Sequence, residues 1–191
     1  MSKPLLVFQA PCATRSGYGE RSRDLLRALI ELDKYDIKVI STRWGQTPLN
    51  ALNINNEHDK KIIDRLLFGQ LTQQPDIFIQ VSIPNEFMPM GKYNIGVTAG
   101  IETDRCSGEW LEGCNKMDLI LISSNHSADV IKTTGYEMRN EHHQPVGKLV
   151  FNKNIEVLFE GIDTSIFKKL NSASEFNSTL VKESFNEIKE D

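Results

Sequence analysis

One stretch near the start of the chain constrains its fold more than any other: an apolar run, a glycine-bearing loop and an amphipathic helix follow one another directly. The run, residues 5–10, is strand-length, lies between two prolines and does not alternate, which favours a strand covered on both faces of a parallel sheet. After the loop 11–19, leucines at helical spacing predict a helix over residues 20–32. A helix N-terminus at this corner presents N–H groups and a partial positive charge, so it is suited to an anion.

Composition limits the class of protein. The 191 residues suffice for one domain, with or without an appendage, and for a sizeable core. The 22 basic and 26 acidic side chains give a net charge of −4, which does not point to nucleic acid or an anionic membrane as a partner. The three cysteines fit reduced thiols, no apolar run reaches the roughly 18 residues of a membrane span, and no signal peptide precedes the first strand. We therefore expect a cytoplasmic protein with no membrane span and no nucleic-acid partner.

Strand-like and helical patterns then alternate along the chain. Further strands are expected at residues 35–41, 76–81, 93–99 and 118–122, with weaker candidates at 148–151 and 155–158. Helices are expected at 57–71, from 107 onward, and at 128–134 with Gly135 as its C-cap, while 42–56 is a long loop and 136–154 is less regular. This alternation predicts an α/β fold, Rossmann-like and doubly wound, with a mostly parallel sheet and helices on both faces. We expect the domain to span residues 1–168, followed by a polar tail, 169–191, that forms a helix and packs back on it.

Loops that follow the expected strands should meet at the carboxyl edge of the sheet, where such folds bind ligands. Tyr18, between two glycines, is placed to stack on a ring, although the glycine pair also fits a simple tight turn. Glu102 and Asp104 are two residues apart, so on an extended loop they face the same side. There they can bind sugar hydroxyls or transfer protons, and the alternative is a solvated acidic turn.

Several familiar chemistries lack their residues. The loop around Gly17 and Gly19 has no third glycine, and no Gly-Lys-Ser/Thr occurs, which argues against an NAD site and a P-loop. His142 and His143 fit a surface loop better than a metal site, because no third ligand is suitably spaced. The sequence places no histidine to activate a cysteine, so a buried or spectator thiol is favoured over a nucleophile.

Four stretches together resemble the N-terminal, acceptor-side domain of GT-B glycosyltransferases of the group 1, family 4-like class. Residues 16–26 resemble its glycine loop and first helix, and 100–104 with Glu109 and Trp110 resemble its E-T/S-D…W segment. Residues 118–127 resemble its strand-to-helix step, and 160–167 resemble its G-(V/I)-D-T-x-x-F turn. The four occur in the order of that class and cover residues 5–167.

The resemblance implies hexosyl transfer from a nucleotide-sugar, the donor substrate, to a sugar or glycoconjugate acceptor. It implies no other cofactor and no metal. The residues it assigns to the donor phosphate side are Gly17, Tyr18 and Gly19; it gives catalytic roles to Glu102 and Asp104 and acceptor binding to Thr103, Asn85 and Glu86. The transfer would rest on positioning and on stabilising the leaving diphosphate.

The chain also departs from that class at two points. The short stretch after Phe167 cannot hold the second domain that carries the nucleotide-sugar site, and Gln80 stands where many members have a histidine. We therefore expect the N-terminal half of a glycosyltransferase, inactive as an isolated chain: either a split enzyme whose donor-binding domain comes from a partner chain, or a piece of a longer, two-domain enzyme. The alternative is a non-catalytic binding or structural module that uses the same fold.

Overall fold

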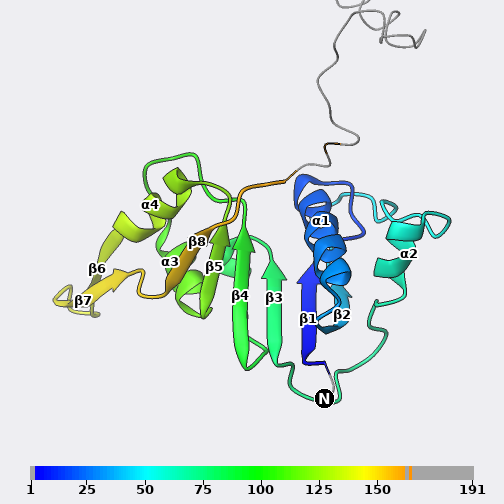
Figure 1. Cartoon of the computed structure of the whole chain (residues 1–191). Coiled ribbons are helices and arrows are strands. Elements are labelled where there is room, and N and C mark those ends of the chain that lie inside the picture. Colours follow the sequence, from blue (N-terminus) through cyan, green and yellow to red (C-terminus); the bar gives the residue numbers. More distant parts are fainter. Residues whose placement is uncertain (1–2, 162–163, 165–191) are drawn as a thin grey trace, which may run out of the picture. The chain divides into compact units, whose positions relative to one another are not determined.

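The computed structural model describes residues 3–161 and 164. A six-stranded sheet, parallel at every strand pair, carries helices on both faces (Figure 1). Its strands are β1 (Leu5–Ala10), β2 (Asp36–Ser41), β3 (Ile77–Val81), β4 (Tyr93–Thr98), β5 (Leu119–Ile122) and β8 (Asn154–Val157). The helices are α1 (Gly17–Leu32), α2 (Glu57–Ile63), α3 (Gly108–Asn115) and α4 (Asn125–Thr133), with a short 3-10 helix, η1 (Pro84–Glu86). The predicted Rossmann-like, doubly wound α/β fold is confirmed.

The strand order β2-β1-β3-β4-β5-β8 reverses at β1, because β2 lies on one side of it and β3 on the other. In open parallel sheets such a reversal leaves a crevice beyond the carboxyl ends of the strands, and ligands bind there. We therefore expect a ligand site at the carboxyl edge of the sheet.

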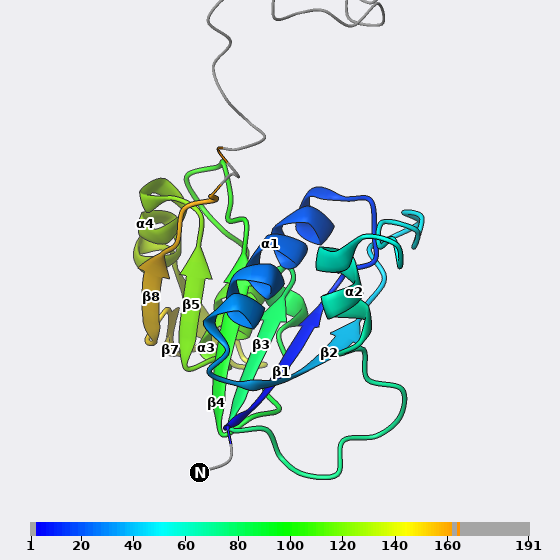
Figure 2. The same ribbon diagram turned by 45° about the vertical axis from the view of Figure 1, so that its right-hand side comes forward.

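Two apolar cores cover the two faces of the sheet. Alternate side chains of β1 go to opposite cores, as the pleat of a strand requires: Leu6 and Phe8 to one, Val7 to the other. The first core includes Leu26 of α1 and Ile62 of α2, and the second is closed by residues of α3 and α4. Figure 2 shows α1 lying across one face of the sheet, and α2 packs into the same core.

The predicted helix over residues 57–71 is wrong in its second half. The helix α2 ends at Ile63, and Leu66 forms an isolated parallel bridge with Val39 of β2. The N–H of Val39 donates to Arg65 O and its C=O accepts from Leu67 N, each at 2.8 Å. These bonds pair the outer edge of β2, and the chain leaves the helix to make them.

The stretch after α4 also differs from its prediction. Ser124 caps α4 by accepting a hydrogen bond from Ser127 N at 3.1 Å, so the helix begins three residues earlier than expected. Gly135 is not its C-cap; it begins β6 (Gly135–Arg139), which pairs antiparallel with β7 (Pro145–Val150). Most residues of this hairpin are exposed, so no apolar alternation marks it in the sequence.

One compact unit ends at Glu160. The predicted polar tail, residues 169–191, lies outside the described residues, as does the end of the predicted domain at 168. Among the helices that the structure describes, none combines the length and the apolar character that a bilayer crossing demands.

Candidate functional site

The helix α1 begins inside the glycine loop, three residues before its predicted start. Ser16 has extended backbone geometry, and its Oγ accepts a hydrogen bond from Gly19 N at 3.0 Å. Its C=O accepts from Glu20 N at 2.9 Å, which starts the helical ladder. Within residues 3–161 no group accepts a hydrogen bond from the N–H of Gly17 or Tyr18. These two donors are therefore open to an anionic ligand.

The two glycines of the loop have different roles. A Cβ on Gly19 would lie 2.4 Å from Thr14 O and 3.0 Å from Pro11 O, so this position needs glycine for close packing of α1 on the loop. A Cβ on Gly17 would meet nothing within 4 Å. Gly19 is therefore structural, whereas the backbone at Gly17 is open to approach.

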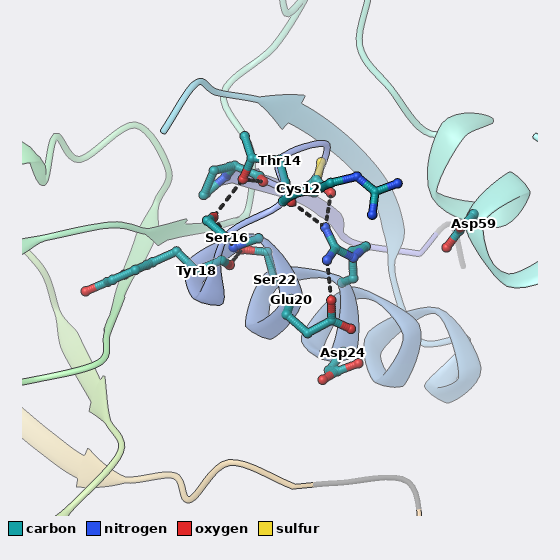
Figure 3. A network of polar contacts seen from close by, with 12 residues as sticks. Cys12, Thr14, Ser16, Tyr18, Glu20, Ser22, Asp24 and Asp59 are labelled. Atoms are coloured by element: carbon teal, nitrogen blue, oxygen red, sulfur yellow. Dashed lines mark hydrogen bonds and ion pairs between the residues drawn. The ribbon is translucent and has the colours of Figure 1, made fainter. Parts of the chain in front are cut away.

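A polar network fixes the loop between β1 and α1 (Figure 3). Arg23, whose side chain is 7% exposed, donates to Cys12 O and Thr14 O at 2.9 Å each and pairs with Glu20. Thr14 Oγ1 donates to Pro11 O at 2.8 Å and lies 2.8 Å from Ser16 Oγ. The buried guanidinium supplies donors to carbonyls that the turn would otherwise leave unpaired, and this holds the N-terminus of α1 in place.

Tyr18 extends away from this network, toward the carboxyl end of β4 (Figure 3). Its hydroxyl lies 3.1 Å from Thr98 Oγ1 and accepts a hydrogen bond from Ala99 N at 3.2 Å. Its ring stacks on Trp44 of the loop 42–56, with ring centroids 4.2 Å apart and planes inclined by 24°. The ring that the sequence offers to a ligand thus already has one aromatic partner within the chain.

A pocket of about 160 Å³ lies beside the first turn of α1, at the carboxyl ends of β3, β4 and β5 and just after β8. It is lined by Gly17, Tyr18, Arg21, Val81, Val97, Thr98, Ala99, Leu121, Ile122, Ser123, Leu158 and Glu160. This is the edge at which ligands bind in parallel α/β sheets. The pocket and the open N–H groups of α1 together form the candidate site.

The charges at the pocket are few. Among its described lining residues the one cation is Arg21 and the one carboxylate is Glu160. The guanidinium of Arg21 donates to Leu158 O at 2.9 Å and to Phe159 O at 3.3 Å, which ties the segment after β8 to α1. The pocket is therefore closed on one side by a cation held in place by backbone carbonyls.

A second, open hollow of about 590 Å³ lies beside the same helix end, and three arginines contribute to its lining. Arg15 donates to Asn50, Arg23 is held by the network above, and Arg27 pairs with Asp24 and Asp59. The first pocket remains the better candidate, because it lies beyond the carboxyl ends of the strands, where parallel α/β sheets bind ligands.

The pocket includes only two of the residues that the sequence assigned to a site. Gly17 and Tyr18 line it, whereas Gly19 is packed against the loop. Glu102, Thr103 and Asp104 are exposed on the connection from β4 to α3 and do not line it. The hydroxyl of Thr103 donates to Arg105 O at 2.8 Å, and its C=O lies 3.3 Å from His126 Nε2.

The predicted acceptor residues Asn85 and Glu86 lie in η1, which packs against α3 and does not line the pocket either. The carboxylate of Glu86 accepts a hydrogen bond from Ser82 Oγ. The amide of Gln80 donates to Glu86 O and accepts from Met88 N, both at 2.9 Å. The residue in place of the expected histidine is therefore a brace for this connection.

Sequence reasoning missed four polar residues of the pocket: Arg21, Thr98, Ser123 and Glu160. Arg21 lies one helical turn after Gly17, and that spacing places both on one face of α1. Thr98 ends β4 and Ser123 follows β5, so the rule that ligands bind beyond strand ends would have found them.

Among the described residues, neither the thiols nor the potential metal ligands form a second candidate site. Cys12, Cys106 and Cys114 are all buried and free. Burial raises the pKa of the Cys114 thiol to about 12, and it raises the pKa of Cys12 as well, so neither is a thiolate near neutral pH. In the part of the chain that the structure describes, no three histidine, cysteine or acidic side chains gather as metal ligands would.

The fold and the pocket define a class: an α/β domain with a ligand pocket at the carboxyl edge of a parallel sheet. Comparison of the chain with protein-family models, with curated proteins and with solved structures found no match. The inference of function therefore rests on the geometry of this pocket and on the residues around it.

Proposed function

We propose that this chain forms the acceptor-side domain of a glycosyltransferase, which transfers a sugar from a nucleotide-sugar to an acceptor. A donor-binding domain on a partner chain completes the cleft. The supporting observation is the pocket itself: it lies between the open N–H groups of α1 and the ends of β3, β4 and β5. At about 160 Å³ it is smaller than the roughly 300–1,000 Å³ of a complete ligand site, as one wall of a shared cleft would be.

The chemistry assigned to this wall is electrostatic. In sugar transfer from a nucleotide-sugar the leaving group is a nucleoside diphosphate, on which negative charge develops. The N–H groups of Gly17 and Tyr18 and the partial positive charge of α1 are suited to stabilise that charge, and Arg21 lies one turn further along the same helix. The polar network around Arg23 holds these donors in place before the substrate binds, so little reorganisation is needed.

The test uses the full chain together with its donor-binding domain, with UDP-glucose and GDP-mannose as probes. Gly17→Val is the informative variant: a Cβ at this position would meet nothing within 4 Å, so we expect the fold to be kept, and the added side chain stands beside the open N–H groups and should hinder the approach of a ligand to them. We expect kcat/KM to fall by about 100-fold, as when a donor to the reacting oxyanion is removed. Ala28→Val adds the same side chain on an exposed position of α1 and should leave kcat/KM unchanged. Equal kcat/KM for the two variants would refute the assignment.

A second candidate function, a non-catalytic binding module, is favoured by one observation. Glu102 and Asp104, the predicted catalytic pair, are exposed and do not line the pocket. If the chain is part of an enzyme, Glu102→Ala should lower turnover without changing the affinity for UDP-glucose. If it is a binding module, UDP-glucose binds with no turnover in the native chain, and Glu102→Ala changes nothing.

A further inference from the structure

The pocket has an apolar floor that the sheet register creates. Val81 of β3 pairs with Val97 of β4, and Val97 pairs with Leu121 of β5. All three pack with the core on the α1 side of the sheet, so they form a row across three neighbouring strands. Leu158, after β8, extends the apolar lining beyond this row.

The polar groups beside this floor are largely bonded to one another. The hydroxyls of Tyr18 and Thr98 share a hydrogen bond, and Ser123 Oγ donates to Ala99 O at 2.5 Å. Arg21 donates to the carbonyls of Leu158 and Phe159. A ligand with hydroxyls all round its ring would lose water on entering and find few partners in return, which is unfavourable.

We propose that the pocket receives a single apolar ring, the aryl or cycloalkyl group of an alcohol, rather than a pyranose. A cavity of about 150 Å³ lined by aliphatic side chains can hold one benzene ring, and this pocket measures about 160 Å³. Glu160, at the lining, is the carboxylate that can accept a hydrogen bond from the hydroxyl of such an alcohol. The binding of this ring does not depend on the proposed function. Only the statement that the alcohol receives the transferred sugar rests on it.

The experiment compares cyclohexanol with glucose, two six-membered rings that differ in their hydroxyls. Binding to the full chain is followed by NMR through the methyl groups of Val97 and Leu121. We expect cyclohexanol to shift these signals and to bind at least about tenfold more tightly than glucose, a discrimination within reach of an apolar pocket. Tighter binding of glucose, or no binding of either ring, would overturn the proposal.

Two variant pairs localise the binding. Leu121→Gln should weaken cyclohexanol binding by about tenfold, whereas Leu119→Gln, two residues earlier on the same strand and likewise half-buried, should not. Should both β5 variants fail to fold, the more exposed pair serves: Leu158→Gln lines the pocket and Phe159→Gln does not. Equal effects within the folded pair would also overturn the proposal.

The proposal of a ring site and the proposal of sugar transfer can be refuted independently of each other. Cyclohexanol binding needs only the pocket, whereas the effect of Gly17→Val on kcat/KM needs the helix end and a donor. Loss of the first with the second intact would place a different acceptor in this cleft, and the reverse result would leave a ring-binding site without glycosyl transfer.

Discussion

Gly17 and Gly19 are two residues apart, yet the structure uses them in opposite ways. Gly19 allows α1 to touch the carbonyls of Pro11 and Thr14, and Gly17 leaves the backbone uncovered at the pocket. The sequence contains the same residue twice and cannot separate the two roles, because the difference depends on how the helix approaches the loop. At the scale of single residues, the structure thus separates close packing, at Gly19, from an open backbone, at Gly17.

This division predicts opposite effects on stability. Gly19→Ala places a Cβ 2.4 Å from Thr14 O and 2.7 Å from Thr14 Oγ1, and backbone at this distance cannot yield without moving the loop. We expect a loss of about 1–3 kcal/mol, typical of overpacking, measured by urea unfolding. Gly17→Ala is the matched control: it meets nothing, so it should be neutral or slightly stabilising. Equal stability of the two variants would contradict the assigned contact.

At the scale of elements, the connection from β3 to β4 shows how one side chain fixes a loop. Gln80 is 4% exposed near the end of β3, and its amide bonds both Glu86 O and Met88 N. The same connection packs closely on α3, since a Cβ on Gly113 would lie 1.8 Å from Pro84 O. These contacts position η1 and therefore the first part of the connection from β3 to β4.

Replacing this brace should destabilise the protein. Gln80→Met keeps the length of the side chain but removes its hydrogen bonds to Glu86 O and Met88 N. We expect a loss of about 1–3 kcal/mol in the free energy of unfolding, because each of the two lost hydrogen bonds contributes about 0.5–1.5 kcal/mol. Gln70→Met, on an exposed loop position, is the control and should change stability by less than about 0.5 kcal/mol. A Gln80→Met variant as stable as this control would show that the brace contributes nothing.

The accuracy with which the sequence predicts the structure also differs from one element to another. The strands β1, β3 and β5 are largely apolar because both faces of the sheet are covered there, and their composition predicts them to within a few residues. The sequence does not predict the hairpin β6–β7, because most of its residues are exposed. It does not predict the early end of α2 either, because that end depends on the pairing of Leu66 with Val39. In the site, Gly17 and Tyr18 follow from a local pattern. The stack of Tyr18 on Trp44 joins two separate loops and leaves no local signal.

At the scale of the whole molecule, the candidate site lies at the carboxyl edge of the sheet, and an aspartate joins the strands at the amino edge. Asp76 Oδ2 accepts a hydrogen bond from Leu5 N at 2.9 Å, and its Oδ1 accepts from Lys92 Nζ at 2.7 Å. Its C=O accepts from Tyr93 N at 3.1 Å, so the residue joins the beginnings of β1, β3 and β4. The hydrogen bond from Lys92, with that from Leu5 N, holds the pKa of Asp76 below its ordinary value of 3.8.

This lowered pKa predicts how stability depends on pH. The folded chain holds the charged form of Asp76 more strongly than the unfolded chain, so its contribution is fully present above the ordinary pKa and is lost as pH falls through the lower folded pKa. Asp33, whose pKa is lowered by Lys3, acts with the same sign. Asp76→Asn should therefore destabilise the protein relative to the native chain near neutral pH, and the difference should shrink once the carboxyl of the native chain is protonated.

Urea unfolding at about pH 7, above the ordinary pKa of 3.8, and at about pH 2, well below it, measures the two differences. Asp64→Asn is the control, since Asp64 is exposed and takes part in no ion pair among the residues that the structure describes. It should show no such change between the two conditions. A destabilisation by Asp76→Asn that is the same at both pH values would mean that the charge of Asp76 does not stabilise the amino edge, and that its role there is only that of a neutral hydrogen-bond acceptor for Leu5 N.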